Sequence, residues 1–490
     1  MKKLIFSILL AAECHGAMAQ MTLNDCLVYA RDHAPRNVIN GIAVRQAASD
    51  SRIAAADLMP SLSLSSNGNF SFGRNIDPET NTYDNRKTLY TGFGLQMSLP
   101  LFDGLVNVSN LKAAKTGKLR QQEAARLEAD NISLEVIRSF YNVSYCKAMV
   151  AQMQEQLERD LRNLKATELG LQLGTKSGAD VAEIEAIVAS DRYELTNQRN
   201  LLSKAYLKLR SVMGMEPDDR ELELTEEEYV GEPDAGFVHP RIAEAHFGLQ
   251  QSKYNLRSAK GAFSPVISLN AGVSTSYYKI FGPGYVNRRF PQQWHDNMGQ
   301  YIGFSVYIPI FSGLSRVNRL KKAKLEVKRR EALLEEARLV TDREKREARL
   351  DFDAATEELE AAKARVLAEE TAYKAVQRKF ELGDASAIDL YTSGAKLATA
   401  RANREGKRIQ KIISRILLGY YNGEKLIRGC LKTDVNAGVA DFGGYFFLRE
   451  QERTGCTRLR QRMKDTQKMQ SRSNFSHYNQ PPNKTKEILK

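Results

Sequence analysis

Cysteine and histidine are scarce in this chain of 490 residues, which contains five cysteines and six histidines. The four cysteines that follow residue 20 are far apart and include no Cys-x-x-Cys pair. Their spacing therefore predicts neither a disulfide framework nor a zinc site. Signatures of hydrolases, metalloproteases and phosphate-binding loops are also missing, although each of those chemistries needs its residues at a fixed spacing. We therefore expect no catalysis, no metal site and no cofactor.

Long apolar runs are missing too, except at the start, which reads MKKLIFSILLAAECHGAMAQ. A basic pair there precedes an apolar run and an Ala-Met-Ala cleavage pattern, so residues 1–19 are expected to be a secretory signal peptide. Lipidation of Cys14 is the alternative, although Glu13 stands where a lipid-attachment motif needs a small residue. No later segment has the roughly 18 apolar residues that a membrane-spanning helix needs.

Acidic residues are outnumbered by basic ones, 59 to 72, which gives a net charge of +13. Residues 424–490 carry +7 of this surplus, whereas residues 20–423 carry only +5. The main body is therefore not unusually basic, and we expect no nucleic-acid partner for it. We interpret residues 424–490 as a basic, disordered tail. Contact of this tail with nucleic acid or peptidoglycan is the alternative.

The second half of the chain repeats the first. A step of 209 positions carries Pro100 onto Pro309, with no gap across 115 residues. The same step matches Phe102 with Phe311, Gly104 with Gly313, Gly174 with Gly383, Ser177 with Ser386, Asp180 with Asp389, and Gly214 with Gly423. Such a fixed offset indicates an internal duplication.

Helix breakers are absent from residues 314–382, which contain no glycine or proline. A helix of this length measures roughly 100 Å. The matching segment 105–173 is interrupted only by Gly117 and Gly170. The helices predicted on either side, at 36–58 and 178–213, are much shorter. Together they equal about one long helix, so we expect them to stack end to end beside it.

Alternating apolar and polar residues precede each long helix and predict β-hairpins at 61–100 and 266–309. Their polar loops are expected at 73–89 and 279–299. Four strands cannot close a barrel, and open sheet edges are not tolerated in lipid. A membrane barrel would therefore need several chains. A water-soluble β-sandwich shows the same alternation and is the alternative.

The predicted fold class is mixed α/β, mainly α, with two tandem repeats. The first repeat covers 20–214, with hairpin 61–100, long helix 101–173 and return helix 178–213. An acidic connector at 215–238 leads to the second repeat, 239–423, with hairpin 266–309, long helix 310–382 and return helix 387–422.

These features resemble the TolC-like outer membrane efflux proteins of Gram-negative bacteria. The resemblance covers about residues 21–423 and rests on the duplication, the SLPLFDG and YIPIFSG turns, and the LGxxSxxD segments at 173–180 and 382–389. It implies a homotrimer in which three chains form one twelve-stranded barrel in outer membrane lipid and a helical periplasmic tube. It also implies a passive exit duct, recruited by a periplasmic adaptor and an inner-membrane pump. A secreted or periplasmic coiled-coil scaffold is the alternative, but it leaves the paired hairpins unexplained.

The resemblance places the LGxxSxxD segments at the tips where each long helix turns back. Residues expected to face the adaptor are Gly174, Lys176, Ser177, Gly383 and Ser386. Asp180 and Asp389 are candidates for an acidic periplasmic constriction, whereas a favourable charge at a helix N-terminus would explain them without any channel function. Ala385 stands where the family often has a basic residue, and Lys176 is a candidate substitute.

The repeated Pro-x-Phe-x-Gly turns are expected at the seam between barrel and tube. Proline would end the strand, phenylalanine would lie near the membrane boundary, and glycine would permit the bend. The seam residues are Pro100, Phe102, Gly104, Pro309, Phe311 and Gly313.

Overall fold

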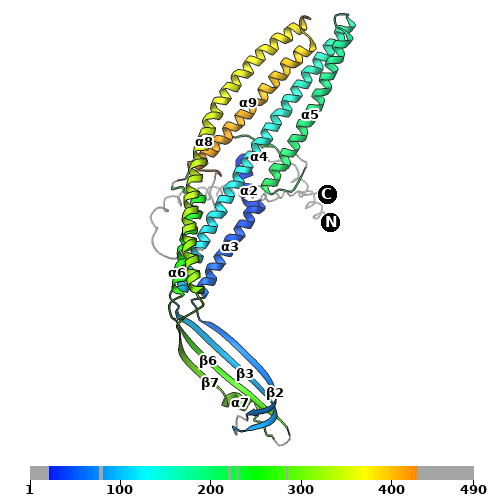
Figure 1. The fold of residues 1–490 in the computed structure, drawn as a ribbon. Coiled ribbons are helices and arrows are strands. Elements are labelled where there is room, and N and C mark those ends of the chain that lie inside the picture. Colours follow the sequence, from blue (N-terminus) through cyan, green and yellow to red (C-terminus); the bar gives the residue numbers. More distant parts are fainter. Residues whose placement is uncertain are drawn as a thin grey trace, which may run out of the picture. The chain divides into compact units, whose positions relative to one another are not determined.

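The computed structural model describes residues 21–427, apart from 77–80, 219–221, 228, 230, 235 and 283–284. The chain divides into two units, residues 1–428 and 429–490, and the first is described below. The predicted signal peptide and the tail beyond residue 427 lie outside the described residues. Most of the first unit is helical (Figure 1). Among the helices described, none combines the length and apolar character needed to cross a bilayer.

Two long helical hairpins dominate the first unit (Figure 1). They consist of α4 (Val106–Gln172) with α5 (Gly178–Met213), and α8 (Ser315–Glu381) with α9 (Ala387–Tyr421). Both long helices have 67 residues, or roughly 100 Å. Each begins five residues later than its expected start at 101 or 310. The segments in between continue the strand or form the turn that leads into the helix.

Three shorter helices complete the bundle: α2 (Leu23–His33), α3 (Pro35–Ala56) and α6 (Pro240–Gly261). Both α3 and α6 have proline at their first turn, where its missing N–H costs nothing. Helix α4 packs against α3, α5 and α6, and α8 packs against α6 and α9. The order α3, α4, α6, α8 therefore leaves α3 and α8 at the two edges of the described bundle.

The short helices meet end to end, as their lengths predict. Gly214 ends α5 with φ +78°, and a Cβ atom there would lie 2.8 Å from the carbonyl oxygen of His33. The start of α3 therefore lies against the end of α5. In the second half, the His239 ring before α6 stacks on Tyr421 at the end of α9, with ring centroids 5.6 Å apart. Two shorter helices thus lie end to end along each long helix.

The main core lies where α2, α4, α5 and α9 meet. Its fully buried side chains include Leu27, Ile137, Phe140 and Leu209. Helix α2 was not anticipated, although Thr22 and Asp25 form a capping box at its start. That Thr-x-x-Asp spacing before apolar residues was the available sequence signal.

A four-stranded antiparallel sheet lies at one end of the unit (Figure 1). Its order is β2 (Ser61–Ile76), β3 (Tyr83–Phe102), β6 (Val266–Phe281) and β7 (Gly299–Tyr307). The loop expected at 73–89 is wrong, because β2 and β3 remain paired as far as Ile76 and Tyr83. The loop expected at 279–299 contains the helix α7 (Phe290–Asp296).

Two small strand pairs correct the predicted connector and tail. Within the connector, β4 (Leu224–Thr225) pairs with β1 (Met21–Thr22), and β5 (Glu232–Pro233) pairs with β8 (Glu424–Lys425). The expectation of disorder from residue 424 is therefore wrong for its first residues. Leu426 is only 6% exposed and packs into the main core, which fixes this short segment.

Candidate functional site

The sheet has one apolar and one polar face. Cross-strand partners share a face, and the register sets Leu64 opposite Leu95, Leu95 opposite Val273, and Leu269 opposite Phe304. The other members of this face near the helices are Leu62, Met97, Leu99, Ile267, Ala271, Ile302 and Val306. Many are exposed, including Leu64 at 78% and Phe304 at 73%. An apolar surface of this extent needs an apolar environment.

The opposite face carries serine, asparagine, glycine and glutamine. Ser98 donates a hydrogen bond to the Asn270 side chain at 3.0 Å, and Asn270 donates to Ser305 at 2.9 Å. These bonds cross three strands and form a polar ladder. Strands of membrane barrels alternate in the same way, with apolar residues facing lipid and polar residues facing an aqueous lumen.

The first seam differs from the expectation at Pro100. Strand β3 does not end there but continues to Phe102, and Pro100 lies opposite Ser268. The β2 ladder stops earlier, at Ser98, so Pro100 has a strand neighbour on one side only. That position tolerates a residue without an N–H group. In the second half the strand ends at Tyr307, two residues before Pro309.

Both seam glycines adopt the left-handed conformation, with φ +70° at Gly104 and +58° at Gly313. The leucines that follow, Leu105 and Leu314, are left-handed too, at +64° and +65°. The left-handed conformation costs a leucine about 1 to 2 kcal/mol. The rest of the fold must therefore impose this sharp turn. The leucine conformation was not anticipated from the sequence.

The environments of the two seams differ. A Cβ atom at Gly104 would lie 2.2 Å from the carbonyl oxygen of Gly261, at the end of α6. A Cβ atom at Gly313 would have no neighbour within 4 Å among the described residues. The Phe311 side chain in the second seam is 81% exposed, against 41% for Phe102. The first seam is closed by packing within the chain, and the second is open.

The hairpin tips end α4 and α8 in the same way. Gly174 and Gly383 have φ +75° and +85°. The N–H of Thr175 donates to the carbonyl of Gly170 at 2.8 Å, and Asp384 donates to Lys379 at 2.8 Å. Together with the shorter-range bonds of the glycines, these complete Schellman motifs. Both glycines therefore terminate their helices in the left-handed conformation.

Asp180 and Asp389 belong to capping boxes. Asp180 accepts from the Ser177 N–H at 2.8 Å, while the Ser177 hydroxyl accepts from the Asp180 N–H at 3.2 Å. Ser386 and Asp389 form the same pair. The backbone bond from Ser177 lowers the pKa of Asp180, and the Ser386 hydroxyl bond lowers the pKa of Asp389. Both carboxylates are therefore charged at neutral pH, and both stabilise their helix N-termini.

Lys176 and Ala385 connect the two tips. The Lys176 ammonium lies 4.4 Å from the centroid of the Phe380 ring, so it reaches from the first tip to the end of α8. Ala385 packs against a cluster that includes Ile184 and Val188 of α5. An alanine at position 385 thus fills an apolar contact between the hairpins, and Lys176 supplies a cation on the neighbouring tip.

A buried acid between α4 and α5 was missed by the sequence analysis. Asp191 is 3% exposed and accepts a hydrogen bond from the Gln156 amide nitrogen at 2.8 Å. Asp191 Oδ2 and Gln156 Oε1 are both buried without a partner. Burial, followed by the neighbouring Asp160, raises the pKa of Asp191 to about 7. A proton on this carboxyl group removes its buried charge and relieves its repulsion with Asp160.

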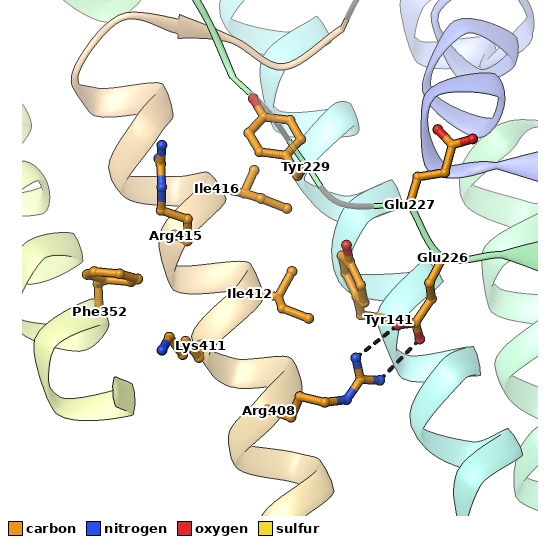
Figure 2. Close-up of a pocket in the computed structure, with 10 residues that line it drawn as sticks. All are labelled: Tyr141, Glu226, Glu227, Tyr229, Phe352, Arg408, Lys411, Ile412, Arg415 and Ile416. Atoms are coloured by element: carbon orange, nitrogen blue, oxygen red, sulfur yellow. Dashed lines mark hydrogen bonds and ion pairs between the residues drawn. The ribbon is translucent and has the colours of Figure 1, made fainter. Parts of the chain in front are cut away.

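A cavity of about 450 Å³ lies beside the connector (Figure 2). Arg408 of α9 points at Glu226 of the connector, with an ion pair of 2.9 Å, and Arg415 pairs with Glu424 at 3.2 Å. Arg408 and Glu226 both line the cavity, and their ion pair fastens the connector to α9. Arg415 also lines it but pairs with Glu424, which lies beyond the end of α9. Among the described residues, no group of three or more His, Cys, Asp or Glu side chains could hold a metal ion.

The sequence matches the model of one protein family, described as outer membrane efflux protein, over residues 41–215 and 238–418. These ranges cover more than half of the chain. The outer membrane efflux protein BepC of Brucella suis is 25% identical over 362 residues, which are 73% of this chain and 74% of BepC. The cation efflux system protein CusC of Escherichia coli K12 is 25% identical over 244 residues, 48% of this chain and 52% of CusC.

Solved structures show the same fold. A crystal structure of CusC aligns with a TM-score of 0.70 at 18% identity, covering 82% of this chain and 92% of CusC. The outer membrane protein VceC of Vibrio cholerae aligns with a TM-score of 0.70 at 17% identity, covering 82% and 96%. The family model therefore confirms the resemblance found from the seam and tip motifs, and the solved structures show the same fold.

Proposed function

This chain belongs to the outer membrane efflux protein family, and we propose that it is an exit duct that conducts substrates passively across the periplasm and the outer membrane. One observation carries the proposal. A sheet with a continuous apolar face and a polar face leads, through two tight turns, directly into two helices of roughly 100 Å. A coiled-coil scaffold has no use for such a sheet.

We place the sheet in the outer membrane and the helices in the periplasm. In the described sheet, β2 and β7 each have a strand neighbour on one side only. Lipid offers no hydrogen bonds to such edges, so the sheet must close on further copies of itself. Three copies supply twelve strands, which is the even-numbered barrel implied by the family resemblance. Helices α3 and α8 would meet across the same boundaries.

The internal repeat fixes the strand register of the proposed boundary. Within the chain, Leu95 of β3 lies opposite Val273 of β6. The offset of 209 carries Leu95 onto Phe304 of one copy. At the start of each hairpin the repeat has an offset of 205, which aligns MPSLSL at 59–64 with SPVISL at 264–269 and carries Val273 onto Gly68 of the next copy. The neighbouring pair is then Val306 with Ser66. Each of these pairs joins positions on the apolar face, so the proposed register keeps both faces continuous.

Cysteine crosslinking tests this assembly. We expect Val306→Cys with Ser66→Cys, or Phe304→Cys with Gly68→Cys, to give covalent dimers and trimers on non-reducing gels. The two pairs lie two residues apart on one face and therefore share one ladder geometry, so a short bifunctional thiol reagent is added to bridge the thiols whether or not that pair type is hydrogen-bonded. The control, Val306→Cys with Phe70→Cys, places the thiols about 13 Å apart along the strand. Crosslinking of the control alone, or of none of the pairs, would contradict the trimer.

We further propose that the duct works with a periplasmic adaptor and an inner-membrane pump. Support comes from the names of relatives, which include a cation efflux system protein and an antibiotic efflux pump outer membrane protein of Pseudomonas putida. The helix tips would face the adaptor through Gly174, Lys176, Ser177, Gly383 and Ser386. The pump supplies the energy, so the duct itself needs no catalytic group.

We propose that Asp180 and Asp389 form an acidic constriction in the trimer. The Asp180→Asn, Asp389→Asn double variant is expected to raise single-channel conductance and reduce cation preference in planar bilayers, because anions are then admitted too. Asparagine keeps an oxygen that can accept from the serine N–H, so the caps survive. The Asp→Ala double variant removes the caps as well. If only the alanine variant differs from the unchanged chain, the carboxylates act as caps and the constriction is wrong.

A further inference from the structure

The segment around α7 is attached to the outer end of β6 by side-chain amides. Strand β7 pairs with β6 only as far as Ser274. Beyond it, Gln293 accepts from the Tyr278 N–H at 2.8 Å and donates to the Tyr278 carbonyl at 2.9 Å. Asn287 binds Ile280 in the same two-sided way, at 2.7 and 2.8 Å. These amides replace a strand neighbour and hold the segment in a fixed position.

Helix α7 lies on the apolar face of the sheet. Its Trp294 ring is 5.1 Å from Phe93, and its Phe290 ring is 5.3 Å from Tyr277. Phe93 shares a face with Leu95, two residues further along β3. Phe290 and Trp294 nevertheless remain 44% and 38% exposed. The aromatic cluster is thus anchored to the sheet on one side and uncovered on the other.

Cationic side chains surround this cluster. Arg288 and Arg289 precede α7, and Lys279 lies on the same sheet face, with its ammonium 5.0 Å from the Phe281 ring centroid. Arg288 forms an ion pair with Asp296 at 3.5 Å. Among the described side chains of the segment from Lys279 to Asp296, the cations therefore outnumber the carboxylate. An aromatic cluster with cations beside it suits a layer that is apolar on one side and phosphate-bearing on the other.

We propose that α7 is an interfacial anchor that lies in the headgroup layer of the outer leaflet. The Phe290 and Trp294 rings lie at the boundary with the acyl chains, and Arg289 and Lys279 bind lipid phosphates. This inference rests on the proposed function, because it requires the apolar face of the sheet to meet lipid. In this role, the segment around α7 sets the depth at which the barrel lies in the membrane.

Trp294 is the only tryptophan of the chain, so its fluorescence reports directly on this segment. The full-length protein is reconstituted into phosphatidylcholine vesicles that contain lipids brominated either near the headgroup or near the bilayer centre. We expect strong quenching by the shallow bromines, weak quenching by the deep ones, and protection from aqueous iodide. Quenching by iodide without bromine quenching would overturn the proposal. Protection from both quenchers would do so too, since a neighbouring protein surface would then cover the tryptophan.

A second measurement tests the cations. Brominated phosphatidylglycerol is titrated into phosphatidylcholine vesicles that contain no other brominated lipid, and the anionic fraction that gives half-maximal quenching of Trp294 is determined. In the Arg289→Gln, Lys279→Gln variant we expect this fraction to rise, by up to about fivefold for each cation removed. Arg365→Gln, an exposed position on α8, is the matched control and is expected to leave it unchanged. Equal values in all three proteins would overturn the phosphate contact.

The outcomes also separate this inference from the proposed function. A protein that fails to float with vesicles or to conduct ions contradicts the channel itself. A protein that conducts ions while Trp294 remains open to iodide contradicts only the anchor.

Discussion

Gly104→Ala is expected to prevent accumulation of folded protein in the outer membrane. The added Cβ would lie 2.2 Å from the Gly261 carbonyl oxygen and 2.6 Å from the Ser264 Cβ. Neither group is the flexible end of a long side chain, so the backbone of α4 or α6 would have to move. Overpacking and the left-handed conformation together cost about 2 to 5 kcal/mol. That is a large part of the roughly 5 to 15 kcal/mol that stabilises an ordinary folded protein.

Gly313→Ala is the matched control for this variant. Its φ of +58° carries the same conformational cost, about 1 to 2 kcal/mol, but no described atom lies within 4 Å of the added methyl group. We expect near-normal amounts in outer membrane fractions and a small decrease in melting temperature by circular dichroism. Equal losses in both variants would show that backbone conformation, and not the contact with Gly261, limits the seam.

The thermal stability of the helical hairpin is expected to fall as the pH rises towards 7. The pKa of Asp191 is about 7 in the fold, against 3.8 for an ordinary aspartate. Between these values the folded chain holds a proton that the unfolded chain has lost. Stabilisation by that proton is complete below pH 3.8 and is lost as the pH rises through 7, with a slope of at most about 1.4 kcal/mol per pH unit.

Asp191→Asn is therefore expected to raise the melting temperature at pH 8 and to flatten its dependence on pH. Asparagine keeps an oxygen that accepts from Gln156 Nε2, as Asp191 Oδ1 does, and it carries no charge whose burial would cost stability at pH 8. Asp342→Asn, on the exposed side of α8, should leave the profile unchanged. A variant that still loses stability between pH 5 and 7 would place the titrating group elsewhere.

Features set by short segments could be predicted from the sequence. The duplication, the four strands and the two long helices follow from the spacing of glycine, proline and apolar residues, and the long helices end next to Gly174 and Gly383. The strand ends were less predictable. The polar residues at 73–89 predict a loop, but residues 73–76 of β2 and 83–86 of β3 are paired, because backbone pairing does not depend on side-chain polarity.

Features set by contacts distant in the sequence could not be predicted. Gly261 is an ordinary residue at a helix end until the fold brings it against Gly104. Asp191 resembles any charged residue of an amphipathic helix, and only the packing of α4 against α5 reveals its burial. The role of the Gln293 and Asn287 amides is likewise visible only in the fold, where they bind the backbone of β6 beyond the end of its pairing with β7.

The unequal seams bear on the mechanics of the proposed tube. Inside each chain, Gly104 and Gly261 bring two backbones into direct contact. In the proposed trimer, the repeat would place Ala56 in the position of Gly261 at the boundary between chains, and its methyl group would keep Gly313 of the neighbouring chain at a greater distance. Stiff and compliant joints would therefore alternate around the ring. When the duct dilates, the strain should be taken up at the boundaries between chains, while each chain moves as a rigid body.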